Sequence, residues 1–490
     1  MRTAHTVDNV RRAEAELMAR LPDGALMLRA AAGLAAACAE VLRGGSGGRI
    51  YGSRVVVLAG SGDNGGDALY AGARLARRGA GVHAVLLAPG RAHPGGLAAL
   101  LAAGGRVADD PYEVLAFADL VIDGITGIGG RGGLRPDAVP VARAARGSRA
   151  VVVAVDLPSG VEADSGEVRG EALRADLTVV FGTEKPALLV DPARGYAGTV
   201  RLVDIGIGDE LPSLPALEAL QHVDVARLLP EPGAASDKYR RGVVGIAAGS
   251  ARYPGAAVLA VAGALRGGAG AVRYVGHAAD QVIARFPEAL VHAGPPEKAG
   301  RVQAWVVGPG IGDELDAVDE VLAAPVPVLV DADGLRRLPG YPGLLRDRAA
   351  PTLLTPHAGE AAALLGTSRE EVEAARLDAV RELAGRYGAT VLLKGSTTLV
   401  ADPDPAVPVR VNTMGTPWLA TAGSGDVLSG LAGSLLAAGL GARNAGSVAA
   451  YLHGLAARAA TERVGVPLTA FDVADTVPHA WHDTRTAREP

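Results

Sequence analysis

The sequence predicts an α/β protein built from two tandem domains. The chain has 490 residues, which is more than one hydrophobic core ordinarily organises. Short, continuous apolar runs alternate with segments of helical length, as in mostly parallel sheets that helices cover on both faces. The alternation lapses once, after Ile207, and then resumes as a second series.

The first series begins with a helix and continues with six strands. Apolar residues recur at helical spacing from Val10, behind three residues that can cap a helix: Thr6, Asp8 and Asn9. The order predicts a three-layer, Rossmann-like domain. The expected strands are VVVL at Val55, VHAVLLA at Val82, LVIDGI at Leu120, AVVVAVDLPSG at Ala150, LTVVFG at Leu177 and VRLVDIGI at Val200.

A segment rich in proline and acidic residues separates the two series. It runs from Gly208 to Asp237 and lacks a strand pattern, so we interpret it as a linker. The expected domains are residues 1–214 and 220–490. The second series consists of GVVGIAAGS at Gly242, AVRYVG at Ala271, AWVVGPG at Ala304, VPVLVDADGL at Val326, PTLLTPHAGE at Pro351 and ATVLLKGSTTLVAD at Ala389.

Composition excludes several kinds of chemistry and partner. The formal net charge is -5, so no broad basic surface is available for nucleic acid or anionic lipid. Cys38 is the only cysteine, which excludes an intramolecular disulfide and a cysteine cluster for metal or redox chemistry. No run of about 18 apolar residues occurs. We therefore expect a soluble, cytoplasmic protein with no nucleic-acid or membrane partner.

The pentapeptide AGSGD occurs twice, at 59–63 and at 422–426. The first copy follows the strand at Val55 and precedes a helical segment. Strand, glycine turn and helix together direct backbone N–H groups towards an anion. The alternative is a tight turn whose acidic residues cap the helix. Because the two halves differ in the order of their glycine loops and acidic strand ends, we interpret the repeat as convergence rather than duplication.

Polar residues follow the later strands of the first series. Asp123 ends the strand at Leu120, and Asp156 and Ser159 follow the strand at Ala150. The carboxyl ends of parallel strands share one edge, so these side chains and Asn64 can converge on a single crevice. Oxygen ligands of this kind suit a hard cation, and a carboxylate left free can act as a base. The alternative is that each aspartate only caps the next helix.

The second AGSGD precedes an apolar helix and puts Asp426 in its first turn. The N–H groups of such a turn can hold a transferring phosphoryl group, and Asp426 can take a proton from an attacking hydroxyl. The alternative is an N-cap formed by Ser424 or Asp426. Lys394 ends a strand and precedes Gly-Ser-Thr-Thr, which favours a nucleotide phosphate, although a merely solvated lysine is the alternative.

Four motifs in the first half resemble the NAD(P)H-hydrate epimerase domain, over essentially residues 1–208. They are DNGGDA, VIDGITGIGGRG, VDLPSG and FGTEKPALLVDPARGYAGTVRLVDIGI. The resemblance implies that Asp156 is the catalytic carboxylate and that potassium binds to Asn64, Asp123 and Ser159. It implies contacts with the hydrated nucleotide by Asp63, Asn64, Gly65, Gly66, Asp67, Gly127, Ile128, Gly129, Gly130, Arg131, Gly132 and Gly133. Asp63 and Ala68 depart from the family motif, which usually has Asn and Gly there.

The second half resembles ADP-dependent NAD(P)H-hydrate dehydratases, which have a ribokinase-like fold, over about residues 224–475. The motifs include VVGPGIG, LVDADGL, TPHAGE, LLKGSTT, TAGSGDVLSG and AAYLHGLAA. The resemblance implies that Asp426 is the catalytic base and that Ala256, Gly310 and His357 also contact the hydrated nucleotide. It implies contacts with the phosphoryl donor by Lys394, Gly395, Ser396, Thr397, Thr398 and Gly425. Trp418 stands where we expect a small residue.

Together the resemblances imply a bifunctional enzyme that repairs hydrated NADH and NADPH. The first domain would interconvert the R and S epimers, and the second would dehydrate the S form with ADP, or ATP, as phosphoryl donor. The implied cofactors are potassium and magnesium, the ligands are the hydrated nucleotides and ADP, and we expect a homo-oligomer. Two alternatives are a vitamin or sugar kinase fused to a Rossmann-like domain, and a nucleotide-binding sensor with degraded sites.

Overall fold

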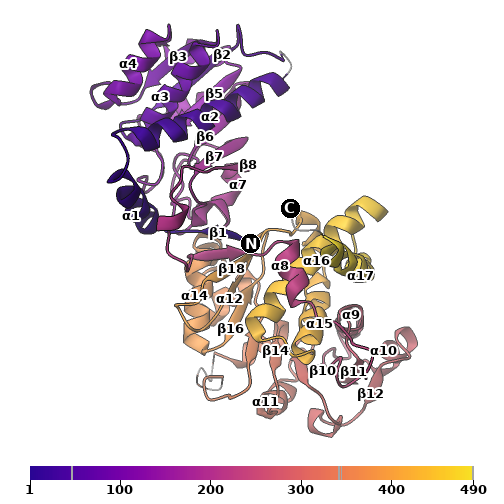
Figure 1. The fold of residues 1–490 in the computed structure, drawn as a ribbon. Helices are drawn as coiled ribbons and strands as arrows, with labels where there is room; N and C mark the ends of the chain where they lie inside the picture. Colours follow the sequence, from indigo (N-terminus) through magenta and orange to yellow (C-terminus); the bar gives the residue numbers. More distant parts are fainter. Residues whose placement is uncertain (46–47, 340–342, 344, 488–490) are drawn as a thin grey trace. The chain divides into compact units, whose positions relative to one another are not determined.

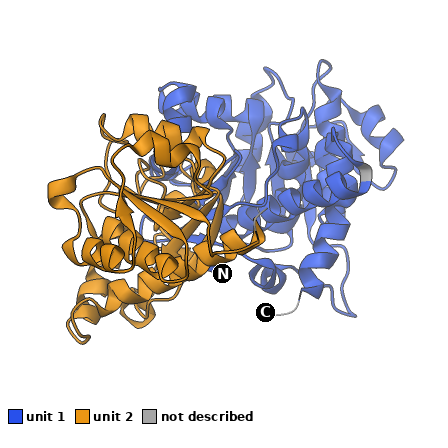
Figure 2. Cartoon of the chain, turned by 90° about the horizontal axis from the view of Figure 1, so that it is seen from above, with its two compact units in different colours: residues 1–2, 217–490 blue, residues 3–216 orange. Residues whose placement is uncertain are grey.

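The chain forms two compact α/β units (Figure 2). In the computed structural model, which describes residues 1–45, 48–339, 343 and 345–487, one unit consists of residues 3–216. The other combines residues 217–490 with Met1 and Arg2. We call them the N-terminal unit and the C-terminal unit. The predicted class, two α/β units with mainly parallel sheets, is confirmed.

Seven parallel strands form the sheet of the N-terminal unit (Figure 1). They are β2 (Arg54–Ala59), β3 (Gly81–Leu86), β4 (Arg106–Val107), β5 (Leu120–Gly124), β6 (Val151–Val155), β7 (Leu177–Phe181) and β8 (Thr199–Val203). Their order is β4-β3-β2-β5-β6-β7-β8. The first strand of the series therefore lies inside the sheet, and the chain winds outwards from it in both directions.

Helices of the N-terminal unit cover both faces of this sheet, as the continuous apolar strands predict. Val55 and Val57 of β2 belong to a core with α2 and α3, while Val56 and Leu58 belong to a second core with α5 and α6. Thr6 caps the first helix by accepting a hydrogen bond from the Asn9 N–H. The helices are α1 (Val7–Met18), α2 (Ala25–Gly44), α3 (Asp63–Ala76), α4 (Pro94–Ala102), α5 (Pro111–Ala116), α6 (Val139–Gly147) and α7 (Arg194–Ala197).

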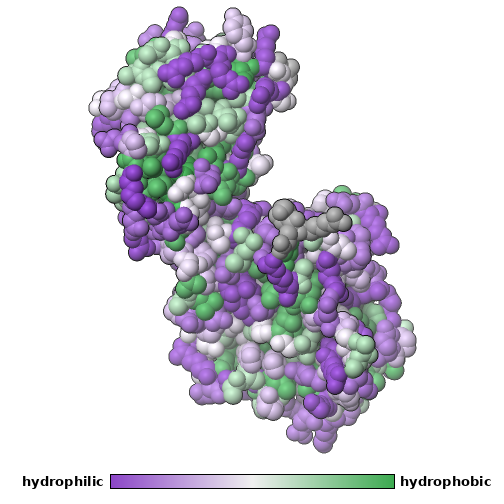
Figure 3. Space-filling view, in the orientation of Figure 1, coloured by the Kyte–Doolittle hydropathy of each residue, from purple (hydrophilic) through white to green (hydrophobic). Residues whose placement is uncertain are grey.

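Helix α2 is long and apolar enough, by length and composition, to cross a membrane. The sequence showed no uninterrupted apolar run there because Arg29 and Glu40 lie within the helix. Leu34 and Cys38 of α2 are fully buried, and burial raises the pKa of the Cys38 thiol to about 12. The helix is therefore a core element of its unit. On the face in Figure 3, hydrophilic and hydrophobic side chains are interspersed on this unit.

The C-terminal unit is built on a larger mixed sheet with the order β1-β9-β18-β17-β16-β15-β14-β13-β10-β11-β12. The strands from β10 to β16 pair in parallel, whereas β17 is antiparallel to both its neighbours. The bounds are β1 (Arg2–Ala4), β9 (Leu217–Ala219), β10 (Val243–Ala247), β11 (Ala271–Val275), β12 (Leu290–His292), β13 (Ala304–Val307), β14 (Val328–Val330), β15 (Thr352–Leu354), β16 (Thr390–Leu393), β17 (Thr398–Ala401) and β18 (Val409–Asn412). In the stretch ATVLLKGSTTLVAD, where a strand was expected to end at Lys394, β16 ends at Leu393 and a turn at residues 394–397 leads into a second, antiparallel strand, β17.

Helices α9, α15, α16 and α17 pack together over the core of the C-terminal unit. Helices α9 and α15 approach closely, since an ideal Cβ on Gly430 would lie 1.9 Å from the Ala260 carbonyl oxygen. The helices are α8 (His222–Leu228), α9 (Pro254–Arg266), α10 (Ala279–Arg285), α11 (Asp316–Ala323), α12 (Ala358–Leu365), α13 (Arg369–Ala374), α14 (Arg376–Tyr387), α15 (Ser424–Ala437), α16 (Ala442–Val464) and α17 (Ala470–Thr486). Short 3-10 helices are η1 (Pro89–Arg91), η2 (Pro186–Leu188), η3 (Gly208–Glu210), η4 (Pro296–Lys298), η5 (Ala332–Arg337) and η6 (Pro417–Leu419).

The segment that we interpreted as a linker contains regular structure. Its residues Leu217–Ala219 form β9, which pairs with β18, and α8 follows with Val225 fully buried. The C-terminal unit accordingly resumes at Leu217, before the predicted start at residue 220. The strand was missed because it is short and its partner lies far along the chain.

We expect residues 1–216 and residues 217–490 to fold separately, because each unit has its own sheet and core. Each fragment should give a single cooperative urea transition by circular dichroism. A fragment that starts at Leu220 is the matched control: it lacks β9 and should unfold at a lower urea concentration than the fragment that starts at Leu217. Fragments that are molten while the whole chain is stable would contradict independent folding.

Candidate active sites

The two predicted substrate segments of the N-terminal unit lie at the point where its strand order reverses. Strands β2 and β5 are neighbours, and their carboxyl ends lead into residues 60–67 and 125–133. Ligands of open α/β sheets bind in the crevice at such a switch point. The Gly60 N–H donates to the Gly124 carbonyl at 3.0 Å, and a Cβ on Gly60 would lie 1.9 Å from the Ile125 carbonyl oxygen. Only glycine permits this approach of the two loops.

The three predicted potassium ligands also lie at this edge. Asp123 is fully buried and accepts hydrogen bonds from the Ser159 N–H at 2.9 Å and the Ser159 hydroxyl at 2.6 Å. Burial raises the pKa of Asp123 to about 6, against the opposing effect of the bonds from Ser159 and Ile125. Asn64 lies against Gly127, and its Nδ2 is buried with no hydrogen-bond partner among the described residues. The structure thus brings the Ser159 hydroxyl against a fully buried carboxylate.

Asp156 lies in a left-handed backbone conformation and forms a buried ion pair with Lys185. Its φ is 65°, a value that non-glycine residues seldom adopt outside functional or special turns. The Lys185 ammonium contacts Asp156 Oδ1, which also accepts the Phe181 N–H at 3.1 Å. Lys185 further donates to the Phe181 carbonyl at 3.1 Å and is 1% exposed. The sequence analysis missed Lys185; the scarcity of lysine was the only available signal.

More carboxyl groups surround this pair than one lysine can balance. Burial, reinforced by Asp156, Asp63 and Glu14, raises the pKa of Asp67 well above its usual range. Asp67 Oδ1 is buried without a hydrogen-bond partner among the described residues. Burial also raises the pKa of Glu14, a residue of α1 that the sequence analysis did not single out; Lys185 opposes this effect. The crevice is therefore acidic, with Lys185 as its buried cation.

A cavity of about 570 Å³ borders the predicted phosphate loop of the N-terminal unit. Residues 128–132 form one wall, the start of α1 another, and Glu162 accepts the Gly132 N–H at 2.6 Å. The guanidinium groups of Arg11 and Arg131 belong to the lining. The loop thus faces a space large enough for part of a nucleotide.

In the two AGSGD segments the aspartate occupies a different position of the helix that follows. Gly423 has a φ of 85°, available to glycine at no steric cost, and α15 begins at Ser424, so that Asp426 is its third residue. In the first copy α3 begins at Asp63 itself. No side chain caps α15, and the Ser424 hydroxyl donates to the Leu419 carbonyl at 2.8 Å. The N–H groups of this turn are therefore not used by a capping side chain.

Lys394 lies between two carboxylates beside this turn. Its Nζ is 2.7 Å from Asp331 Oδ1 and 3.8 Å from Glu360 Oε2. The same atom is 3.5 Å from an ideal Cβ position on Gly425. Burial raises the pKa of Asp426 to about 7; Asp331, Asp333 and Glu360 add to the effect and Lys394 opposes it. The turn thus combines N–H donors that no side chain caps, a cation, and a carboxylate suited to accept a proton near neutral pH.

His357 caps α12. Its Nδ1 accepts the N–H groups of Gly359 at 3.0 Å and Glu360 at 3.2 Å, while Glu360 Oε2 accepts the His357 N–H at 2.7 Å. This reciprocal pair is a capping box, and the spacing of His and Glu in HAGE could have predicted it. The imidazole remains more than half exposed, so capping leaves its outer face available to a ligand.

The other predicted residues of the C-terminal unit fall into two groups. Gly310 lies against Ala256, with an ideal Cβ on Gly310 only 2.6 Å from the Ala256 Cβ. The residues 394–398 form the β16–β17 turn, which Arg376 holds by donating to three carbonyls, those of Leu393, Lys394 and Thr397. The sequence analysis missed Arg376, because its partners lie in another element.

The three residues that depart from the family motifs are Asp63, Ala68 and Trp418, and they differ in exposure. Asp63 is exposed at the first position of α3. Ala68 is fully buried, and its Cβ would lie only 2.6 Å from an ideal Cβ built on Gly124. Trp418 is 44% exposed in η6, in the loop before the second glycine turn.

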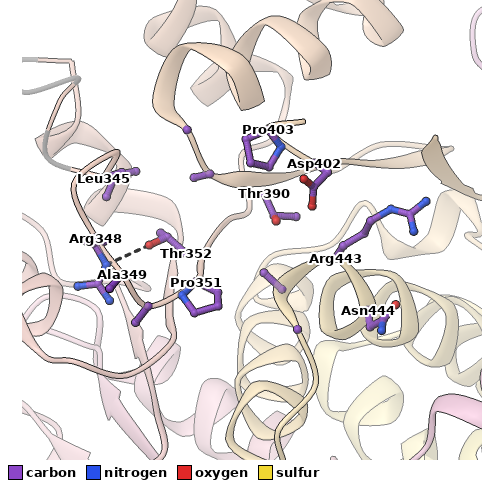
Figure 4. A pocket seen from close by; sticks show the side chains of 15 residues that line it. Leu345, Arg348, Ala349, Pro351, Thr352, Thr390, Asp402, Pro403, Arg443 and Asn444 are labelled. Carbon is purple, nitrogen blue, oxygen red and sulfur yellow. Dashed lines mark hydrogen bonds between the residues drawn. The ribbon is translucent and has the colours of Figure 1, made fainter. Parts of the chain in front are cut away.

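A second cavity, of about 470 Å³, lies in the C-terminal unit at the amino ends of β15 and β16 (Figure 4). Its polar groups are used internally: Arg348 donates to the Thr352 hydroxyl at 3.1 Å, and Arg443 contacts Glu218 at 2.8 Å. The predicted catalytic residues are at the carboxyl ends of the strands. Lys394, Asp331 and Asp426 are not among the residues that line this cavity.

The fold and the two sites define a bifunctional α/β protein, a Rossmann-like domain joined to a ribokinase-like domain. Residues 23–187 match the family model described as YjeF-related protein N-terminus, and residues 244–479 match that of NAD(P)H-hydrate dehydratase. The bifunctional NAD(P)H-hydrate repair enzymes Nnr of Mycobacterium leprae and Mycobacterium tuberculosis are each 50% identical to this chain. The alignments cover 93% of this chain and 94% of the first protein, and 90% of this chain and of the second.

The chain belongs to the family of bifunctional NAD(P)H-hydrate repair enzymes. The family predicted from the motifs is thereby confirmed. A ribokinase-like protein from Enterococcus faecalis has a similar fold, with a TM-score of 0.50 and 22% identity, over 56% of this chain and 98% of that chain.

The buried pair of the N-terminal unit makes a prediction about stability. Lys185→Met leaves the Asp156 carboxylate buried without its cation and should lower the free energy of unfolding by about 3–5 kcal/mol. The double variant Asp156→Asn/Lys185→Met should lose less than the single variant, because no charge is left unpaired. Urea unfolding of the unit measures both. Arg78→Met, at an exposed position of the same unit, is the control; equal losses in the single and double variants would contradict the pairing.

Proposed function

We propose that this chain repairs hydrated NADH and NADPH in the cytoplasm, epimerising their R and S forms in the N-terminal unit and dehydrating the S form in the C-terminal unit. The ligands are the hydrated nucleotides and ADP or ATP, without nucleic acid or membrane as partner, and the chain assembles as a homo-oligomer. The observation that supports this proposal most is Asp426, a carboxyl group with a pKa of about 7 directly behind a glycine turn.

In the proposed dehydration, the oxygen of the ring hydroxyl attacks the terminal phosphorus of the donor. Asp426 takes the proton of that hydroxyl during the attack. The N–H groups at the start of α15 and the Lys394 ammonium stabilise the negative charge of the transferring group. ADP is left as AMP. The phosphorylated carbon then loses phosphate, the neighbouring carbon loses a proton, and the double bond of the dihydronicotinamide ring is restored. Phosphate is a far better leaving group than hydroxide.

Magnesium fits this site as the counter-ion of the donor phosphates. Asp331, Asp333, Glu360 and Asp426 oppose a single lysine there, so a polyphosphate needs a further cation to enter. No group of three or more His, Cys, Asp or Glu in the described part of the chain is arranged to hold a metal. This agrees with an ion that keeps its waters and binds mainly to phosphate oxygens. When bound, it supplies charge neutralisation of the transferred phosphoryl group.

In the proposed epimerisation, Asp156 moves a proton at the hydroxylated carbon centre, with Lys185 balancing its charge. The left-handed backbone at Asp156 and its fixed hydrogen bonds hold the carboxylate in one orientation. Potassium fits the oxygen atoms of Asn64, Asp123 and Ser159, because Asp123 is a fully buried carboxylate, and the Asn64 side chain has a buried amide nitrogen with no hydrogen-bond partner among the described residues. The ion would supply positive charge that organises the crevice.

Asp426→Asn should abolish nucleotide-dependent dehydration, since the amide cannot accept the proton; we expect a loss of about 100- to 10,000-fold. A mixture of hydrate epimers with ADP, magnesium and potassium is followed by dihydronicotinamide absorbance and phosphate release. In the unaltered protein the rate should fall as pH drops through about 7, where Asp426 becomes protonated. Epimerase activity is the internal control. Near-normal phosphate release by the variant would refute this role, and a stable phosphorylated product would instead indicate a kinase.

Asp156→Asn should separate the two activities. With mixed epimers and excess ADP, the variant should show a fast phase that stops at the share of the S form, followed only by slow uncatalysed epimerisation. The unaltered protein should run to completion in one course. Addition of the separate N-terminal unit should rescue the variant, which controls for damage to the dehydratase. Rapid, complete conversion without rescue would mean that another carboxylate acts, with Asp123 the first to test.

A further inference from the structure

One buried carboxylate ties together three elements of the dehydratase site. Asp331 follows β14 and is 1% exposed. Its Oδ1 is 2.7 Å from the Nζ of Lys394, at the end of β16, and its Oδ2 accepts the hydroxyl of Ser429 at 2.6 Å. Ser429 lies on α15, one turn after Asp426. Asp331 is the first aspartate of the motif VDADGL and is not among the site residues predicted from the sequence.

The backbone fixes the direction of this carboxylate. The Asp331 N–H donates to the Val307 carbonyl at 3.0 Å, and its own carbonyl accepts the Gly334 N–H at 3.0 Å. Ala332, the next residue, has a φ of 49°, in the left-handed region that a residue with a Cβ seldom adopts. Surrounding contacts must maintain such a conformation, and it is found mainly where geometry serves a site.

The partners of Asp331 are the parts that phosphoryl transfer would use. Without Asp331, the flexible lysine stem could turn its ammonium away from the glycine turn. With Asp331, the Lys394 Nζ stays 3.5 Å from the Cβ position of Gly425. The bond to Ser429 restrains α15, which carries the turn and Asp426. One side chain thus sets the distance between the cation and the base.

We propose that Asp331 is the positioning residue of the dehydratase site: it holds Lys394 against the glycine turn with one oxygen and α15 with the other. This inference rests on the proposed function of the C-terminal unit. Asp331 itself does not touch the reacting atoms, since it is buried beneath Lys394 and α15. The negative charge of Asp331 favours the protonated forms of both Lys394 and Asp426.

Asp426 has several charged neighbours besides Asp331. Lys394 faces it from β16, Asp333 from η5 and Glu360 from α12. On α16 the buried His453 bonds to the Ser424 backbone; burial lowers its pKa to about 4, so it is neutral near pH 7. His357 caps α12 and acts on Glu360. Asp331 is the largest of the charged influences that raise the pKa of Asp426, and it also raises that of Lys394.

The first test is the pH profile of dehydratase kcat/KM. Asp331→Asn removes a negative charge near Asp426, so the acid limb should move to lower pH by about one unit. Ser429→Ala is the matched control, because it cuts the tether to α15 and keeps the charge; its limb should stay in place. Asp331→Glu keeps the charge and alters the reach, so its plateau should fall while its limb stays. A plateau equal to that of the unaltered protein in Asp331→Glu would overturn the positioning role, even if Asp331→Asn fails to fold.

The second test needs no catalysis. In Asp331→Asn, Lys394 loses the carboxylate that favours its ammonium form, so the pKa of Lys394 should fall. The lysine amine should then react faster with acetic anhydride, about tenfold for each unit by which its pKa falls. The exposed Lys238 and Lys298 are internal references for mass spectrometry of the full chain. Unchanged labelling of Lys394 together with an unmoved acid limb would overturn the proposal. If the unaltered protein has no dehydratase activity, the proposed function fails, while the labelling still decides whether Asp331 holds Lys394.

Discussion

Both units depend on how the charge of buried aspartates is balanced at the carboxyl edge of a sheet. A carboxylate taken out of water is costly unless a cation or several donors meet it. Lysine occurs only four times in the chain, and two of the four are largely buried beside such an aspartate: Lys185 with Asp156, and Lys394 with Asp331. An ammonium is a compact charge on a flexible stem, which lets loops close around it. The edge loops of each unit are arranged around these pairs.

The two pairs distribute charge differently, and this difference suits two kinds of proton transfer. In the N-terminal unit the lysine contacts the proposed catalytic carboxylate directly. In the C-terminal unit it pairs with Asp331, and Asp426 has a raised pKa among other carboxylates. When two carboxyl groups have different surroundings, their pKa values differ. Enzymes commonly use this difference to make one group an acid and another a base. The same residue types thus provide two distinct sites.

The sequence predicted what depends on local pattern. Continuous apolar runs predicted most of the long strands, and strand-end polar residues such as Asp123 and Ser159 were correctly expected to meet at one edge, since they are hydrogen-bonded to each other. It could not predict Lys185 as the partner of Asp156, or Asp331 as that of Lys394. Those pairs join residues far apart in sequence, and only the sheet order brings them together. The capping box at His357 was a local signal that went unused.

The strand β9 was missed for the same reason as the ion pairs, because its pairing with β18 is remote in sequence. The first strand of the β16–β17 hairpin was expected to end at Lys394, next to the observed end of β16, but the apolar residues after the turn were not assigned to a second strand. A glycine followed by Ser-Thr is a turn signal, and the sequence interpretation gave the same residues a phosphate-binding role. Turn and ligand loop are here the same residues.

The division of the chain has a consequence for the order of folding. Met1 and Arg2 belong to the C-terminal unit, although the whole of residues 3–216 separates them from the rest of it. The N-terminal unit is thus, in topological terms, an insertion between residue 2 and residue 217. Closing a flexible loop of that length costs entropy, whereas a folded insertion presents two ends at a fixed separation. Within this unit the Ala216 N–H donates to the Ala4 carbonyl at 2.9 Å, so its two ends lie side by side, and once the unit has folded the entropy cost of closing that loop is already met.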